Sequence, residues 1–233
     1  SSPDYSPGII GANDVLTDYL SSGGHLLLSG QDLAFWDGGG TLRFYPYYTD
    51  FLHSIFKSDN APTRQIICQD ESIFAGMHLD IQGGDGADNQ TSPDEIRVRS
   101  PDYVSLICHY QDGNGALAQT DVCNPHRALN LAFGFEAINN AQDRAQFMAR
   151  ALEWFASPRQ AVGVELLPQS EPTQIVPAGS VLTHTLRLRN LSETGADDTF
   201  KIEIEGAEWK TNVSSPSLEL ASCAMDYLHL HVE

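Results

Sequence analysis

The stretch that decides the predicted fold is Tyr19-Leu-Ser-Ser-Gly-Gly-His-Leu-Leu-Leu-Ser-Gly-Gln-Asp32. A helical pattern of apolar residues reaches Leu20, and the glycine pair 23–24 supplies the positive φ that ends a helix. Residues 25–28 are a short apolar run, typical of a strand buried on both faces. Ser29 then stands at the carboxyl end of this strand, where ligands bind and nucleophiles lie in open α/β sheets.

Two further segments extend this pattern. Residues 128–135 are a second continuous apolar run, and residues 140–155 show the clearest helical periodicity, with Asn140 as the N-cap. Because runs this continuous suit strands covered on both faces, we expect residues 24–28 and 128–135 to be central parallel strands. The helices 13–20 and 140–155 should then pack against the sheet.

The intervening residues predict shorter elements. Residues 104–110 and 115–121 alternate across the turn Asp112-Gly-Asn-Gly115, which favours an antiparallel pair. Residues 49–56 are predicted to be a helix, and residues 64–82 to hold two short strands.

The character of the chain changes at Ser157-Pro158. Beyond residue 162 the helical periodicity is replaced by alternation, at residues 182–188, 200–204 and 227–232, which indicates half-buried strands. The number of residues suits one β-sandwich. We therefore predict two domains, residues 1–158 and residues 161–233, with the boundary between Phe155 and Val162.

The first domain resembles class I glutamine amidotransferase-like (flavodoxin-like) domains, in the quoted stretch and in residues 129–138 (Leu-Asn-Leu-Ala-Phe-Gly-Phe-Glu-Ala-Ile). The resemblance implies an open, mostly parallel α/β sheet. It places Ser29 at or next to the nucleophile position and Glu136 at the glutamate of the family's His-Pro-Glu triplet. Gly134 stands where that triplet has its histidine. A serine needs a base within hydrogen-bond reach, so we expect a degenerate domain without amidase chemistry.

The same resemblance implies that the domain is truncated at its N-terminus. Amidotransferase-like folds have one or more strands before the helix that corresponds to residues 13–20, and we identify none in the preceding loop-like sequence.

The second domain resembles the Ig-like accessory domains found beside the catalytic domains of secreted bacterial hydrolases. The resemblance lies in Pro177-Ala-Gly-Ser-Val-Leu-Thr-His-Thr-Leu-Arg-Leu-Arg-Asn190, in residues 198–200 and 206–209, and in the closing segment 223–232. It implies a non-catalytic spacer or binding module, and a secreted or cell-surface bacterial location.

Composition limits the partners. The formal net charge is −18 and only three lysines occur, which argues against nucleic acid as a ligand. No stretch approaches the roughly 18 apolar residues of a membrane span. The charge is explained by solubility or, alternatively, by divalent-cation binding at carboxylate clusters.

The insert 80–95 is rich in oxygen ligands. Its residues Asp85, Asp88, Asn89 and Asp94 are close enough in sequence to share a Ca²⁺ ion, which takes six to eight oxygens. The spacing is not that of an EF-hand, and the alternative is a solvated acidic loop. We expect no other cofactor.

Four cysteines are present, none with a Cys-x-x-Cys spacing. Cys108 and Cys123 flank the predicted antiparallel pair and could form a disulfide. The alternative is that Cys68, Cys108, Cys123 and Cys223 are all buried free thiols.

Other conspicuous residues have ordinary interpretations. The histidines 78, 109 and 126 lack the spacing of a zinc helix and are interpreted as structural. The aromatic segment 35–48 could be a ligand platform, although packing over a sheet edge explains it as well.

The two resemblances together imply a non-catalytic accessory region of a large secreted bacterial hydrolase, a subtilisin-like or other secreted peptidase by analogy. Its partners would be the other domains of that protein, with a glycan or a protein as a further ligand. Two alternatives stay open: a hydrolase or amidase that uses Ser29, and a carbohydrate- or surface-binding module that uses the aromatic segment.

Overall fold

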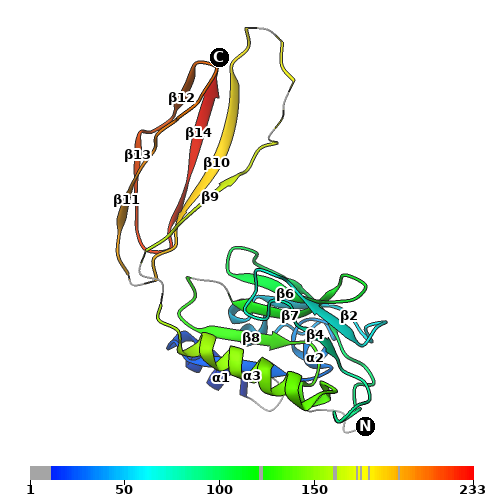
Figure 1. Cartoon of the computed structure of the whole chain (residues 1–233). Helices are drawn as coiled ribbons and strands as arrows, with labels where there is room; N and C mark the ends of the chain where they lie inside the picture. The colour runs from blue at the N-terminus through cyan, green and yellow to red at the C-terminus, as the bar shows by residue number, and fades with distance from the viewer. Residues whose placement is uncertain are drawn as a thin grey trace. The chain divides into compact units, whose positions relative to one another are not determined.

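The computed structural model divides into two compact units, Ser1–Ser157 and Pro158–Glu233 (Figure 1). The residues that the structure describes are 12–120, 123–159, 162–171, 173, 175–177, 179–193 and 195–233.

The first unit combines short strands with a few helices. Its elements, in chain order, are α1 (Ala12–Ser21), β1 (His25–Ser29), α2 (Leu33–Asp37), the π-helical turn η1 (Tyr47–Phe51), β2 (Ser54–Ser58), β3 (Gln65–Cys68), β4 (His78–Asp80), β5 (Glu95–Val98), β6 (Val104–Tyr110), β7 (Gly115–Thr120), β8 (Arg127–Leu131), the 3₁₀ turn η2 (Phe135–Ala137) and α3 (Ala141–Ala156).

The strands of this unit form one curled, mixed sheet of eight strands (Figure 1). The main path has the order β1-β8-β7-β6-β3-β4, and β5 pairs with both β7 and β2. Within the described residues the only parallel pair is β1 with β8, in which Ser29 lies opposite Leu131. Every other pair described in this sheet is antiparallel.

The predicted open, mostly parallel α/β sheet is therefore wrong, and so is the amidotransferase-like resemblance that implied it. The first unit is mainly β, with antiparallel hairpins where a flavodoxin-like fold has strand–helix–strand crossovers. The parallel pairing of the two apolar runs is confirmed, but β1 lies at the end of the strand order rather than at its centre.

Strand β8 shows why continuous apolar runs led to the wrong prediction of a mostly parallel sheet. Leu129 and Leu131 point into one core, which Phe147 of α3 also enters. Ala128 belongs to a second core, on the opposite face of the sheet, together with Leu20 of α1. A strand with cores on both faces has a continuous apolar sequence whether its neighbours are parallel or antiparallel.

Some of the predicted local elements are confirmed and one is wrong. The helix α3 is confirmed, and the Asn140 side chain caps it by accepting a hydrogen bond from the backbone N–H of Gln142 at 2.8 Å. The hairpin β6–β7 is confirmed as well. The predicted helix 49–56 is wrong, because η1 ends at Phe51 and β2 begins at Ser54.

In the second unit the described residues form strands without helices: β9 (Val164–Pro168), β10 (Leu182–Asn190), β11 (Asp198–Lys201), β12 (Thr211–Val213), β13 (Ser217–Leu220) and β14 (Met225–Val232). Two antiparallel sheets result, one of order β12-β14-β10-β9 and one of β11 with β13. Leu188, Leu228 and Leu220, drawn from both sheets, form a shared core.

Across the described part of both units, no helix has the length and apolar character that a membrane span needs.

Candidate functional site

Ser29, the candidate nucleophile, lies at the carboxyl end of β1. The Ser29 hydroxyl donates a hydrogen bond to the carbonyl oxygen of Phe133 at 3.1 Å and accepts one from the backbone N–H of Phe135 at 2.6 Å. Both interactions connect the end of β1 to the segment that follows β8. The hydroxyl is thus used to hold two strand ends together.

Two histidines of the first unit have partners other than Ser29. His53 Nε2 lies 3.1 Å from Asn124 Oδ1, and His126 Nε2 lies 2.8 Å from the carbonyl oxygen of Phe51. Within the described residues, the hydrogen bonds of the Ser29 side chain are both to backbone atoms. Among the hydrogen bonds described for Ser29, none involves the base that a nucleophile needs.

The side chain of Glu136, the second candidate, also takes part in a hydrogen bond within the fold. Its Oε1 accepts a hydrogen bond from Asn89 Nδ2 at 2.9 Å, and the neighbouring Gly134 N–H donates to Gln90 Oε1 at 2.8 Å. A Cβ at position 134 would clash with the Glu136 carboxylate and lie 2.7 Å from Gln90 Nε2. A histidine at this position would displace both side chains, so glycine fits the packing.

A cluster of three carboxylates lies near the start of α2. Oxygen atoms of Asp32, Asp59 and Asp94 all lie within 4.8 Å of one another. Asp32 is the N-cap residue of α2 and has a left-handed φ of 64°. Asp59 follows β2, and Asp94 immediately precedes β5. Three separate connections of the fold therefore meet here; we call these residues the carboxylate cluster.

The innermost member of the carboxylate cluster is Asp94, whose side chain is fully buried. Its Oδ2 accepts the Phe35 N–H at 3.0 Å, while its Oδ1 is buried without a hydrogen bond to any described residue. Burial raises the pKa of Asp94 to about 8; the backbone N–H groups of Phe35 and Ala34 act to lower this pKa, and the charges of Asp32 and Asp59 act to raise it. Burial and the charge of Asp59 also raise the pKa of Asp32.

The predicted ligands of the insert are dispersed. Asp85 forms an ion pair with Arg144 at 2.8 Å, and Asp88 Oδ1 accepts the Gly83 N–H at 2.9 Å. Asn89 bonds to Glu136, as described above. In the described part of the chain, Asp94 clusters with Asp32 and Asp59 and not with Asp85 or Asp88. Sequence reasoning missed Asp32 and Asp59 because neither lies in the insert.

The predicted disulfide between Cys108 and Cys123 is wrong. Cys108 of β6 is bonded to Cys68 of β3, which lies directly opposite it in the antiparallel pair. Cys123 and Cys223 are disulfide-bonded too, so none of the cysteines is a free thiol. Disulfides form and persist in oxidising environments, which is the setting this chain indicates.

The aromatic segment is largely internal. Tyr47 and Tyr48 are fully buried in the same core as Leu20, and the rings of Phe35 and Phe56 are 5.5 Å apart, edge to face. The packing of this segment accounts for most of its aromatic residues.

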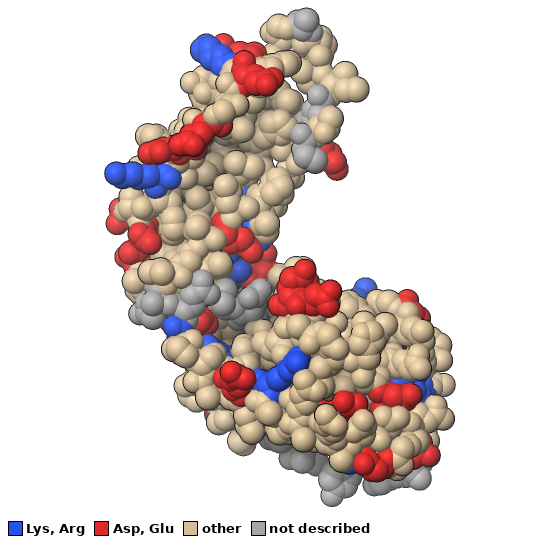
Figure 2. Space-filling view, in the orientation of Figure 1, with Lys and Arg blue, Asp and Glu red and all other residues tan. Residues whose placement is uncertain are grey.

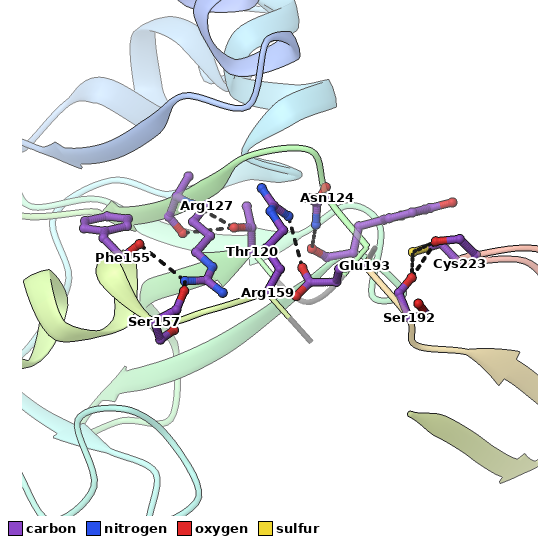
Figure 3. A network of polar contacts seen from close by, with 12 residues as sticks. Thr120, Asn124, Arg127, Phe155, Ser157, Arg159, Ser192, Glu193 and Cys223 are labelled. Atoms are coloured by element: carbon purple, nitrogen blue, oxygen red, sulfur yellow. Dashed lines mark hydrogen bonds and ion pairs between the residues drawn. The ribbon is translucent and has the colours of Figure 1, made fainter. Parts of the chain in front are cut away.

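Polar contacts at the end of the first unit are structural. Arg127, at the start of β8, donates to the carbonyl oxygen of Ser157 at 2.7 Å (Figure 3). It also donates to the carbonyl oxygen of Trp154 at 2.6 Å. Its guanidinium also lies 5.6 Å from the centroid of the Trp154 ring. Arg127 therefore satisfies the terminal carbonyl groups of α3.

Comparison with known proteins does not assign the chain to a family. No protein-family model matches the chain, and no curated protein sequence matches it.

Proposed function

We propose that the chain is a non-catalytic accessory region of a larger secreted protein, in which it acts as a spacer, scaffold or binding module. The proposed parent is a secreted bacterial hydrolase, such as a subtilisin-like or other peptidase. The observation that carries the proposal is the Ser29 hydroxyl, which both donates to and accepts from the backbone. A catalytic serine must instead have its hydroxyl oriented towards a base.

Two other properties support this function. The cysteines are all in disulfides, as is common in secreted proteins. Acidic side chains outnumber basic ones over the visible surfaces in Figure 2, in keeping with the net charge of −18. Such a surface disfavours nucleic acid and favours a soluble segment that faces other proteins or glycans.

Covalent labelling tests the non-catalytic assignment. We expect a fluorophosphonate probe to leave the 233-residue chain unlabelled, under conditions that label an active serine hydrolase to completion. Labelling that is lost in the Ser29→Ala variant would show an activated nucleophile and would overturn the proposal.

A second candidate is a carbohydrate- or surface-binding module in the second unit. A hollow of about 510 Å³ is lined there by Val176, Pro177, Leu182 and Trp209, and the Trp209 side chain is 66% exposed. Exposed aromatic rings that flank a hollow suit sugar faces. Retention on insoluble polysaccharide should fall in the Trp209→Ala variant; equal elution of the two proteins would exclude this candidate.

A further inference from the structure

We propose that the carboxylate cluster, Asp32, Asp59 and Asp94, is a Ca²⁺ site that joins three separate connections of the first unit. The site is independent of the proposed accessory function and uses residues outside those predicted from the insert, apart from Asp94.

The spacing suits this ion. Ca²⁺ is bound at about 2.3–2.6 Å by oxygen ligands, so two oxygens on opposite sides of one ion lie roughly 5 Å apart. The oxygens of the carboxylate cluster all lie within 4.8 Å of one another. One ion can therefore contact all three carboxylates without rearrangement of the backbone.

The second observation is the unpartnered oxygen of Asp94. Its side chain is 0% exposed, and its Oδ1 has no hydrogen bond in the described residues. A buried carboxyl oxygen without a hydrogen-bond partner is unfavourable, and a cation bound among the three side chains would supply the missing interaction.

Nearby groups orient the site without neutralising it. Asp59 Oδ1 accepts a hydrogen bond from Ser92 Oγ, and the Ser92 N–H donates to Gln31 Oε1 at 3.0 Å. The closest described arginine in sequence to Asp59, Arg64, donates to the carbonyl oxygen of Gln90 at 3.2 Å and to Asn60 Oδ1 at 3.0 Å. No ion pair described for the chain includes a member of the carboxylate cluster.

The donor set selects the kind of ion. The three ligands are carboxylate oxygens, which suit a hard cation rather than Zn²⁺ with its preference for nitrogen and sulfur. Ca²⁺ tolerates irregular geometry and variable coordination, and water can complete its shell beside Asp59, which is exposed. An affinity of about 10⁻⁴–10⁻³ M, typical of extracellular modules, is expected.

Calorimetric titration of the 233-residue chain with CaCl₂ tests the site, together with thermal unfolding in CaCl₂ and in EDTA. We expect one bound ion and a rise in Tm of about 5 °C at saturating Ca²⁺. The Asp59→Asn variant changes an exposed side chain and should fold, yet it should lower the affinity at least tenfold and remove the Tm shift. Asp94→Asn should do the same.

Two controls make the result decisive. Asp88→Asn is the matched control in the acidic insert and should retain full binding. NaCl at the same ionic strength should not reproduce the Tm shift, because screening of the net negative charge is not site binding. The proposal is overturned if wild-type protein shows no binding heat, if NaCl gives the same shift, or if Asp88→Asn abolishes binding while Asp59→Asn does not.

Discussion

The Ser29 hydroxyl accepts the backbone N–H of Phe135 at 2.6 Å, and so joins the end of β1 to the segment after β8. The same hydroxyl donates to the carbonyl oxygen of Phe133. The two residues are 106 positions apart in the sequence, so this contact closes the only parallel pair described in the sheet. The serine that looked like a nucleophile in the sequence has a structural role.

We therefore expect Ser29→Ala to lower the free energy of unfolding of the first unit by about 1–2 kcal/mol, because it leaves the Phe135 N–H without its partner. Ser105→Ala, on the exposed side of β6, is the matched control and should change stability by less than about 0.5 kcal/mol. Denaturant unfolding followed by the fluorescence of Trp36 and Trp154 measures both. Equal stability of the two variants would contradict the structural role.

Arg127 is the second residue whose loss should be costly. It is 8% exposed and donates to the carbonyl oxygens of Trp154, Phe155 and Ser157 at the end of α3. Arg127→Met keeps much of the side-chain volume but removes the guanidinium donor of the Ser157 carbonyl, whereas the Trp154 carbonyl keeps the hydroxyl and the N–H of Ser157. We therefore expect a loss of about 1–3 kcal/mol. Arg43→Met, at an exposed position, should be nearly neutral by the same thermal or denaturant measurement. A neutral Arg127→Met would show that water replaces the guanidinium.

The sequence predicted the local elements of the fold better than it predicted how the strands pair. The helix after Asn140 and the hairpin at Asp112-Gly-Asn-Gly115 depend on short-range capping and turn preferences, and both are present. Strand β8 is apolar on both faces because two cores flank it, and that pattern does not distinguish a parallel from an antiparallel neighbour. The inference from continuous apolar runs to an open parallel sheet failed at this step.

In the candidate sites, too, local sequence identified single residues but not their partners in space. Asp94 was found because it lies in an acidic segment, but its partners Asp32 and Asp59 come from connections that are distant in sequence. Cys108 pairs across the sheet with Cys68, 40 residues away, rather than with the nearer Cys123. Both results depend on which strands become neighbours, which no local pattern in this chain specifies.

The disulfide provides a direct prediction. In the chain-entropy model, a crosslink that closes a loop of 40 residues stabilises by about 4 kcal/mol. The Cys68→Ala/Cys108→Ala double variant should lose about this amount in denaturant unfolding without reductant. Peptide mapping under non-reducing conditions should yield a peptide pair that contains Cys68 and Cys108. A pair that contains Cys108 and Cys123 would contradict the strand order of the sheet.

His53 gives the first unit a pH dependence on the acid side. Burial lowers the pKa of His53, and the nearby charge of Arg99 lowers it further, against the opposing effects of the Asn124 hydrogen bond and the charge of Asp50. The unfolded chain therefore binds a proton at His53 at a higher pH than the folded chain does, near the ordinary histidine value of about 6.5. The stabilising contribution is complete above that pH and is lost as the pH falls through the lowered folded-state pKa.

We accordingly expect the free energy of unfolding to decrease as the pH is lowered from about 7.5 towards 5, and to decrease less in His53→Gln, whose amide does not titrate in this range. The comparison isolates His53 from the other seven histidines, which both proteins share. Urea unfolding at a series of pH values measures the two slopes, and an NMR titration of the His53 imidazole measures its pKa independently. If the variant keeps the full wild-type slope, or if the measured pKa of His53 lies above about 6.5, the buried environment assigned to this histidine is incorrect.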